Sequence, residues 1–573
     1  MDAGRRGERI EALTRELTEV FSVTETRGEA EMGERIYAKL AQIPYFQNHP
    51  EYLLRLPIED DPLERISILA LVRGEQGSSG RTVVTLGHYD TVGISDYGAL
   101  AQYANQPDVL AEKLKQLDLP ANVREDLESG DYLFGRGVFD MKVGDAILIQ
   151  LLEEVSQDAE HLEGNLIFAA VCDEEGNSKG MLRLVPELVR LKETLGLEYL
   201  ALLDTDYMTA EYEGDQSKYI YMGTVGKVMP TFFIVGKETH VGEAFRGLDP
   251  NQLAAQITQR INLNPEFSDR EAGMAAMPPV SLQQRDQKTE YSTQIAKTAV
   301  LFFNCVTYHS TPDQILARMR DVAEECFQQV MEQLNQRCQA YCTMLGRPAA
   351  PLPWRPRAIT YQALYDAVRR EAGPGLDQMV QEKCGELSRD PALDACGRTT
   401  KLVEYVHSLW SDQDPVIVVY LTPPYYPHVS VRGETEKERE LLAAVGRAIQ
   451  AAGPEEGIVC KDFFPYISDL SYGAAPGNPE IVQALEHNIP GYGHLYRLPL
   501  REMAKLQIPA LNIGPFGYDA HKWTERLEKR YSFQVTPELV RQTVFGLLNR
   551  GGWGEKDGHE TYGVHHPFSL RNL

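Results

Sequence analysis

The chain has 573 residues, more than one hydrophobic core usually organises, so we expect two domains or one domain with a large insertion. Hydrophobic residues make up 43% and charged residues 24%, a composition that suits a soluble globular protein and argues against disorder. The net charge of −26 would repel nucleic acid and anionic lipid, so neither is an expected partner.

The first residues, MDAGRRGERIEALTREL, are typical of an amphipathic helix and lack the apolar core of a signal peptide. No run of about 18 apolar residues occurs, so no transmembrane helix is expected. The eight cysteines are scattered without a CxxC pair, which favours reduced thiols over a disulfide framework. These features predict a cytoplasmic protein.

Strands and helices alternate in the first part of the chain. Short apolar runs predict buried strands at 81–86, 165–172 and 199–204. Helical spacing predicts helices at 141–155 and 179–195. This alternation predicts an α/β domain with a mostly parallel sheet and helices on both faces.

The middle of the chain has a different pattern. Predicted strands at 228–235 and 300–307 enclose a helix at 251–261. Long helical stretches follow at 312–345 and 360–384, separated by several prolines. We therefore expect an inserted α+β domain with extra helices.

The α/β pattern returns near the C-terminus, with a helix at 436–452, a strand at 508–513 and a closing helix at 537–549. The catalytic domain is therefore expected in two parts, separated by the insert. The expected bounds of first part, insert and second part are 1–225, 226–412 and 413–573.

Histidines and acids gather at or just after the ends of predicted strands, where open α/β sheets bind their ligands. His88 and Asp90 follow the first strand, and such a carboxylate can orient an imidazole that binds zinc. Asp140 lies in the turn GRGVFDMK at the start of a helix, where it can bridge two metals or simply cap the helix. Taken singly, a local structural role is the commoner explanation for both motifs.

Three adjacent acids, Asp173, Glu174 and Glu175, follow the strand at 165–172. They repel one another unless cations or a shared proton neutralise them. Neighbouring side chains at a strand end point to opposite sides, so one glutamate can bind metal while the other transfers a proton. A solvated acidic turn is the alternative.

Asp204 and Asp206 lie at the end of the next strand, and His521 and Glu525 follow the strand at 508–513. Together the clusters provide two histidines and several carboxylates, which suits a mixed nitrogen and oxygen site for two zinc-like ions. Two such ions about 3.5–4 Å apart can activate a water and polarise a carbonyl, with a glutamate as general base and acid.

The order HxD, GRGxxDMK, DEEG, a later Asp and a final His resembles the dizinc metallopeptidase and deacylase family. That family includes carboxypeptidase G, aminoacylases, succinyl-diaminopimelate desuccinylase and tripeptidase T. The resemblance covers both parts of the catalytic domain and is looser in the middle. It implies two divalent ions, zinc before cobalt or manganese, and hydrolysis of an amide bond in a small molecule or short peptide.

The resemblance also implies a role for each matched residue. It makes Glu174 the general base and acid, and Asp90 the residue that orients a histidine ligand. Asp140 is implied to bridge the metals, and Asp206 is a less favoured substitute for Asp204. The implied metal ligands are His88, Asp140, Glu175, Asp204 and His521.

On the inserted domain, His240 matches a family histidine that helps to bind the substrate carbonyl, often across a homodimer interface. An ordinary loop histidine is the alternative. Many relatives carry an arginine later in this domain that grips a substrate carboxylate, but residues 303–309 contain none. Asn304 is the remaining candidate there, and a free substrate carboxylate is not expected to be required.

Stretches such as GHYDTVGISDYG and LFGRGVFDMKVGDA resemble an arginine-utilisation branch of this family, which points to a substrate in arginine or ornithine metabolism. Two alternatives stay open: a mononuclear, manganese or cobalt site, and a non-catalytic binding protein with the same fold. The presence of Glu174 together with every implied ligand disfavours the binding protein.

Overall fold

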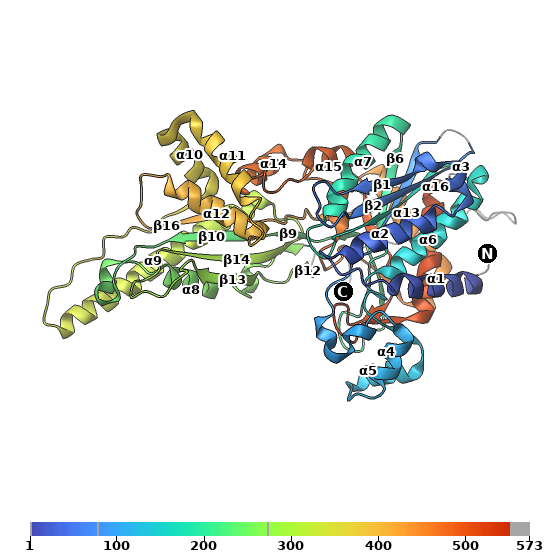
Figure 1. The fold of residues 1–573 in the computed structure, drawn as a ribbon, viewed down its shortest axis with the longest axis horizontal. Helices are drawn as coiled ribbons and strands as arrows, with labels where there is room; N and C mark the ends of the chain where they lie inside the picture. The colour runs from blue at the N-terminus through green and yellow to red at the C-terminus, as the bar shows by residue number, and fades with distance from the viewer. Residues whose placement is uncertain (1–2, 77–78, 272–273, 550–573) are drawn as a thin grey trace.

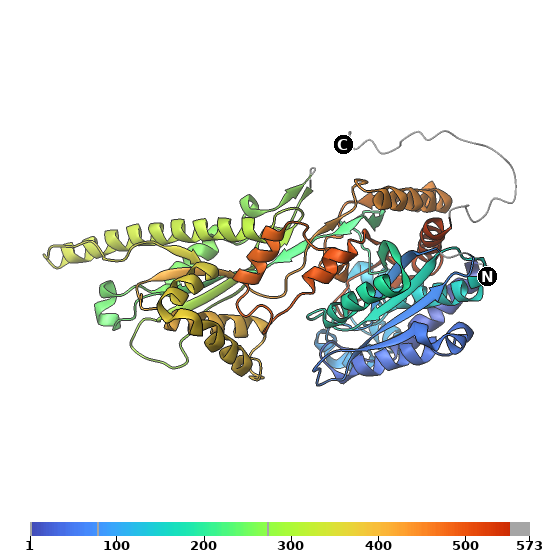
Figure 2. The same cartoon turned by 90° about the horizontal axis from the view of Figure 1, so that it is seen from above.

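The computed structural model describes residues 3–76, 79–271 and 274–549. They form two lobes that lie along the long axis of the molecule (Figure 1). The first lobe contains an eight-stranded sheet and the second a six-stranded sheet. Figure 2 shows the same two lobes from above, with the long helix α9 (Pro312–Met344) along the outer edge of the second lobe.

The eight-stranded sheet is mixed, with a parallel centre. In spatial order its strands are β1 (Leu53–Pro57), β2 (Ile66–Arg73), β5 (Asn165–Val171), β3 (Arg81–His88), β6 (Glu198–Asp204), β19 (Ala510–Asn512), β7 (Lys218–Tyr221) and β18 (Ile458–Lys461). β5, β3, β6 and β19 run parallel, whereas β2 and β7 join them antiparallel. The four central strands therefore end at one edge of the sheet.

Helices cover both faces of this sheet, as predicted. In β5, Leu166 and Phe168 pack on one face while Ile167 and Ala169 pack on the other, and a fully buried side chain of this kind stabilises the fold by roughly 2 kcal/mol. The first face carries α1 (Ala3–Thr18), α2 (Arg27–Leu40), α6 (Lys142–Gln157), α13 (Glu436–Ala452) and α16 (Thr536–Leu548). The second face carries α7 (Lys179–Leu195) and α15 (Leu500–Leu506).

The second lobe is also a sheet between helices. Its strands are β13 (Val280–Asp286), β14 (Thr298–Thr307), β10 (Pro230–Val235), β16 (Val416–Leu421) and β15 (Ala358–Thr360), with β9 (Gly226–Val228) paired to β14. One face carries α8 (Pro250–Ile261) and α9. The other carries α10 (Tyr361–Ala372), α11 (Leu376–Leu387) and α12 (Ala395–Ser408).

Two details differ from the expected middle domain. β16 lies beyond residue 412 and pairs with β10, so the second sheet continues past the position where we placed the end of the insert. The helix expected at 360–384 is two helices, because Pro374 lacks a backbone N–H and Gly373 has a φ of 73°.

Two of the chain's crossings between the lobes are short strands that lie side by side. β8 (Gly223–Thr224) leaves the first lobe and pairs antiparallel with β17 (Val429–Ser430), which follows β16. Just beyond them, Lys227 and Tyr426 form a further antiparallel bridge. Later in the chain, α14 (Pro479–Asn488) packs on α9 and α10 of the second lobe.

The remaining elements are short. They are α3 (Pro44–Asn48), α4 (Pro107–Leu114), α5 (Ala121–Ser129), β4 (Tyr132–Phe134), β11 (Arg270–Glu271), β12 (Met274–Ala275), β20 (Gly517–Tyr518) and β21 (Arg526–Glu528). All eight cysteines are free thiols. Among the described residues, no helix combines the length and apolar character needed to cross a bilayer.

Candidate metal centre

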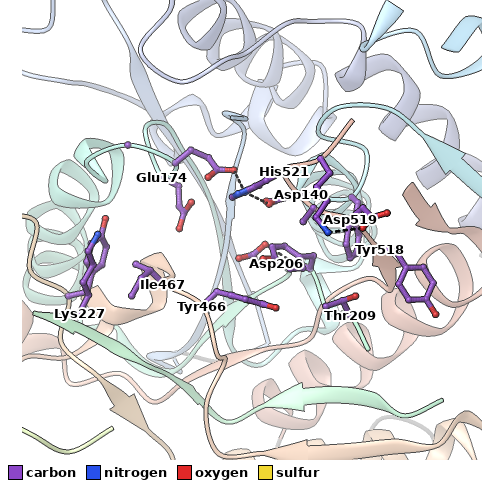
Figure 3. Close-up of a pocket in the computed structure, with 17 residues that line it drawn as sticks. Asp140, Glu174, Asp206, Thr209, Lys227, Tyr466, Ile467, Tyr518, Asp519 and His521 are labelled. Carbon is purple, nitrogen blue, oxygen red and sulfur yellow. Dashed lines mark hydrogen bonds and ion pairs between the residues drawn. The ribbon is translucent and has the colours of Figure 1, made fainter. Parts of the chain in front are cut away.

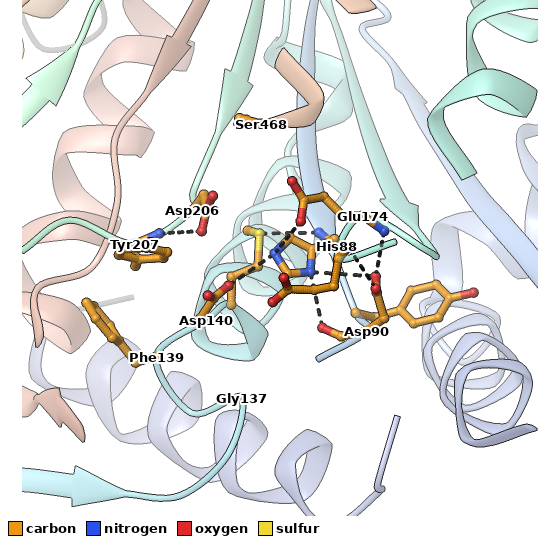
Figure 4. Close-up of polar contacts among 12 residues, drawn as sticks. His88, Asp90, Gly137, Phe139, Asp140, Glu174, Asp206, Tyr207 and Ser468 are labelled. Carbon is orange, nitrogen blue, oxygen red and sulfur yellow. Dashed lines mark hydrogen bonds and ion pairs between the residues drawn. The ribbon is translucent and has the colours of Figure 1, made fainter. Parts of the chain in front are cut away.

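The parallel centre of the first sheet brings three predicted motifs to one edge. His88 is the last residue of β3 and Asp204 the last of β6, and the DEEG motif begins two residues after β5. The registers place His88 beside Val171 and Asp204 beside Leu86, so these strand ends are neighbours. Figure 4 shows His88, Glu174 and Asp140 gathered beneath these strand ends.

Asp140 lies between the two histidines. Its Oδ1 is 3.2 Å from His88 Nε2 and its Oδ2 is 2.9 Å from His521 Nε2. Glu175 Oε1 is also 2.9 Å from His521 Nε2. One carboxylate oxygen facing each histidine is the arrangement needed to bridge two ions. Ligand atoms of His88, Asp140 and Glu175 all lie within 4.8 Å of one another.

The environment of these side chains fits divalent cations. His88 is 3% exposed, and its Nε2 is buried without a hydrogen-bond partner, while Nδ1 lies 3.1 Å from the Asp90 carbonyl oxygen. A buried imidazole nitrogen that faces carboxylate oxygens without a hydrogen bond, with the other nitrogen oriented by the chain, is typical of a metal ligand. His521 is more exposed, at 47% of its side chain.

The buried carboxylates of the cluster also favour the binding of cations. Burial raises the pKa of Glu174 well above its usual value, and the neighbouring carboxylates of Asp469 and Glu175 raise it further. Burial and then Asp140 likewise raise the pKa of Glu175. Bound divalent ions would offset this repulsion. The residues present therefore fit a two-metal site.

The two aspartates after β6 have different surroundings. Asp204 uses both carboxylate oxygens, accepting hydrogen bonds from the Thr205 backbone N–H at 2.8 Å and from Ser468 Oγ at 3.2 Å. Asp206 accepts the Tyr207 backbone N–H at 2.7 Å with Oδ1 and lines the pocket described below. Burial and then Asp140 raise the pKa of Asp206 well above its usual value. Asp206 is thus the aspartate on the pocket side.

Asp90 fixes the position of the DEEG motif. Its two carboxylate oxygens accept the backbone N–H groups of Glu174 and Glu175, each at 3.1 Å. Its Oδ1 lies 3.7 Å from His88 Nδ1, so the contact with His88 runs mainly through the Asp90 backbone carbonyl. Asp90 therefore orients the DEEG motif and His88 together.

Glu525 fixes the position of the turn that carries Asp140. Its Oε1 accepts the backbone N–H groups of Gly137 at 2.8 Å and Phe139 at 3.2 Å, and its Oε2 pairs with Arg136. Arg136 and Glu525 are almost fully buried. Glu525 is close to His521 in the sequence, but its side chain contacts a turn that lies 388 residues earlier in the chain. Nothing in the sequence indicated this contact.

A pocket of about 580 Å³ opens over the cluster (Figure 3). The figure shows Glu174, Asp140 and His521 in its middle, between Lys227 on one side and Tyr518 on the other. The wall also contains apolar and aromatic side chains to which no site role was assigned from the sequence: Phe139, Tyr207, Tyr426, Tyr466 and Ile467.

The two residues expected from the inserted domain do not line this pocket in the described chain. His240 is exposed, and its Nδ1 accepts the Gly242 backbone N–H at 3.1 Å. Asn304 lies on β14, opposite Val280 of β13. Within one chain, therefore, neither side chain is brought to the candidate metal ligands.

Sequence comparison identifies relatives along almost the whole chain. The model of peptidase family M20/M25/M40 matches residues 106–486. Protein RocB of Bacillus subtilis (strain 168) is 34% identical over 545 residues, covering 94% of this chain and 95% of RocB. Protein YqjN of the same organism, which is uncharacterised, is 34% identical over 544 residues, covering 94% of this chain and 96% of YqjN.

Solved structures have the same fold. A tripeptidase from Staphylococcus aureus is similar with a TM-score of 0.51 at 12% identity, covering 95% of this chain and 98% of that one. Aminopeptidase PepT from Bacillus cereus has a TM-score of 0.51 at 13% identity, covering 95% and 99%. The predicted fold class is confirmed. Because the family model spans more than half of the chain, the predicted relationship is also confirmed, and the chain belongs to the peptidase family M20/M25/M40 as a hydrolase.

Proposed function

We propose that the chain is a two-metal hydrolase that cleaves a peptide or N-acyl bond in a small, amino-acid-derived substrate. Members of its family are metallohydrolases that act on amide bonds. The observation that carries the proposal is Asp140, which presents one carboxylate oxygen to His88 and the other to His521, with Glu174 beside them.

The ligand set divides into two groups that share Asp140. His88 and Asp206 would complete one site, and Glu175 and His521 the other. We favour Asp206 over Asp204 because Asp206 faces the pocket, whereas both oxygens of Asp204 already accept hydrogen bonds. The mixed nitrogen and oxygen donors suit zinc, with cobalt or manganese as alternatives. Two ions held there would polarise the substrate carbonyl and acidify a water molecule.

Glu174 is the proposed proton carrier. Its Oε2 lies 3.9 Å from His88 Nε2, so the carboxylate faces the space between the ligands and the pocket. Glu174 takes a proton from the attacking water and returns it to the leaving amine. Asp90 holds the Glu174 backbone N–H, so the carboxylate keeps its place through both steps.

The pocket suits a small substrate with an apolar part. Tyr207, Tyr426 and Tyr466 in its wall can hold such a part and exclude water. A volume of about 580 Å³ accommodates a dipeptide or an N-acyl amino acid. The sequence resemblance to an arginine-utilisation branch, with the 34% identity to RocB, supports a substrate in arginine or ornithine metabolism.

The inserted domain is proposed to act in a homodimer. His240 is exposed and outside the pocket of its own chain, so we infer that it serves the site of a second copy. The free state of all eight cysteines supports a cytoplasmic location.

Glu174→Gln tests the proposal most directly. Loss of the proton carrier should lower kcat for N-acyl amino acids and dipeptides by at least about 100-fold while metal content stays at two ions per chain. Glu59→Gln, at an exposed position, is the control and should behave as wild type. Unchanged hydrolysis by Glu174→Gln would overturn the mechanism.

Metal analysis of protein purified without chelator separates the alternatives. Two ions per chain with activity support the proposal. About one ion per chain with full activity would establish the mononuclear site, and metal-loaded wild type without hydrolysis would favour the binding protein.

A further inference from the structure

Lys227 is a cation in the pocket wall without a counter-charge. The other basic residues of that wall are paired: His521 with Asp140 and Glu175, and Lys522 with Asp519 at 3.1 Å. Among the described residues, Lys227 Nζ has no hydrogen bond or ion pair, and the Tyr426 ring centroid is 5.9 Å away. A partly buried ammonium without a partner is costly unless a ligand supplies one.

The surroundings of Lys227 do not supply the missing charge. Burial lowers the pKa of Lys227, and the nearby thiol of Cys396 is the group that opposes this shift. Burial raises the pKa of that thiol to about 12, so it is neutral at physiological pH and cannot balance the ammonium.

The backbone of Lys227 is held on both sides. It pairs with Val306 of β14 and bridges Tyr426, with Lys227 N–H donating to the Tyr426 carbonyl at 2.8 Å. A side chain on a strand fixed by two neighbours is suited to recognising a group at a defined place. The segment 303–309 contains no arginine, and Lys227 brings a cation beside that same segment.

We propose that Lys227 binds a free carboxylate of the substrate and makes the enzyme selective for amides that carry one, contrary to the expectation that the missing arginine in 303–309 leaves this group unrequired. The inference rests on the proposed function and identifies a specificity residue for it. Peptides and N-acyl amino acids end in a carboxylate, which is the anion such substrates most readily offer to a lysine. In this arrangement the scissile bond lies over Asp140 and Glu174 while the carboxylate extends toward β9.

Matched substrates test the proposal. N-acetyl and N-succinyl amino acids and dipeptides are assayed as free acids and as the corresponding C-terminal carboxamides. Wild type should prefer the acids by about tenfold or more in kcat/KM. Lys227→Met should remove that preference through KM for the acids and leave the carboxamides nearly unchanged, and Lys227→Arg should retain part of it. Lys237→Met, a lysine outside the pocket, should keep the wild-type preference.

Equal use of acids and carboxamides by wild type, or an equal loss on both with Lys227→Met, would overturn the proposal while leaving the hydrolase intact. If wild type cleaves nothing in the panel, the proposed function fails instead. In that case, calorimetry tests the role of Lys227 independently of catalysis by measuring ligand binding. Metal-loaded Glu174→Gln serves as a form that does not turn over its ligand. N-acetyl amino acids should bind it more tightly than their amides, and adding Lys227→Met should abolish the difference. Binding of acids that does not depend on Lys227 would refute the assignment.

Discussion

The two sheets of this protein use polar side chains in different ways. At the edge of the first sheet, buried carboxylates accept hydrogen bonds from the segments that carry the candidate site. Asp90 accepts the Glu174 backbone N–H, and Glu525 accepts the Gly137 backbone N–H in the turn before Asp140. The second sheet is packed with apolar side chains on both faces, and its expected polar contributor, His240, is exposed. The first lobe therefore carries the proposed catalytic residues on a fixed framework, whereas the second, in the part of the chain that the structure describes, contributes shape and the proposed carboxylate-binding Lys227 at the junction.

Glu525→Gln tests the hydrogen-bonded framework at the edge of the first sheet. We expect it to have the largest effect of the changes considered, on both stability and metal affinity. Removing the charge leaves the buried Arg136 with Asp96 as its remaining carboxylate partner, which should lower the free energy of unfolding by about 3 kcal/mol, the lower end of the cost of breaking a buried ion pair. Because Asp140 sits on the turn that Glu525 holds, metal affinity should also fall by about 10-fold to 100-fold. Denaturant unfolding and chelator competition measure the two effects.

Glu528→Gln is the matched control, since Glu528 lies on β21 away from the metal ligands. Wild-type metal affinity in Glu525→Gln would show that the turn keeps its place without the ion pair.

Substitution of the two aspartates after β6 tests which of them binds a metal ion. Asp206→Asn should weaken one metal by about 10-fold to 100-fold, because it removes a charge that faces the pocket. Asp204→Asn should weaken metal binding less, since its oxygens serve Thr205 and Ser468. Metal titration of the two variants shows which substitution weakens metal binding more. The reverse order would restore Asp204 as the ligand.

His407 provides a smaller effect confined to the second lobe. It is buried beside Phe233, and burial, helped by Lys297 and Arg357, lowers the pKa of His407 to about 4. The folded pKa lies below the unfolded value of about 6.5, so His407 contributes stability above pH 6.5 that is lost as the pH falls toward 4. Unfolding at pH 7.5 and pH 5 should differ by about 2 kcal/mol from this group.

His407→Leu should remove that part of the pH dependence and leave metal content unchanged. The difference between wild type and variant isolates His407 from other titrating groups. Parallel pH profiles of the two proteins would contradict the assignment.

The elements that the sequence predicted well are those in which local pattern and tertiary position agree. The run LIFAAVC after Asn165 is apolar throughout, as expected of a strand like β5 that is covered on both faces, and the helix at 436–452 coincides with α13. β16 was left outside the insert because the run VIVVYL looks the same in either sheet, and only its pairing with β10 assigns it. Strand-end motifs likewise predicted which residues gather, because parallel strands end together.

The sequence could not predict contacts between distant segments. Asp204 and Asp206 have the same residue type two positions apart, and only their hydrogen bonds and the pocket distinguish them. Lys227 lies just before the strand predicted at 228–235 and carried no signal of its own, since its lack of a counter-charge depends on what surrounds it in space. Tyr426 and Tyr466 in the pocket wall come from segments without any motif, whereas Tyr207 and Tyr518 lie close to Asp206 and His521 in the sequence but had no predicted role.

The paired strands β8 and β17, which join the lobes together with the two chain crossings that flank α14, have a mechanical consequence. In any rotation about this crossing, a point moves in proportion to its distance from the pivot. Lys227 lies next to the crossing and bridges Tyr426, whose hydroxyl contacts Ser178 just after the DEEG motif at 3.0 Å, so Lys227 would be displaced little. His240 follows the outer end of β10 and would sweep through a much longer arc. Charge recognition would then be insensitive to the angle between the lobes, whereas any contribution from His240 would depend on it.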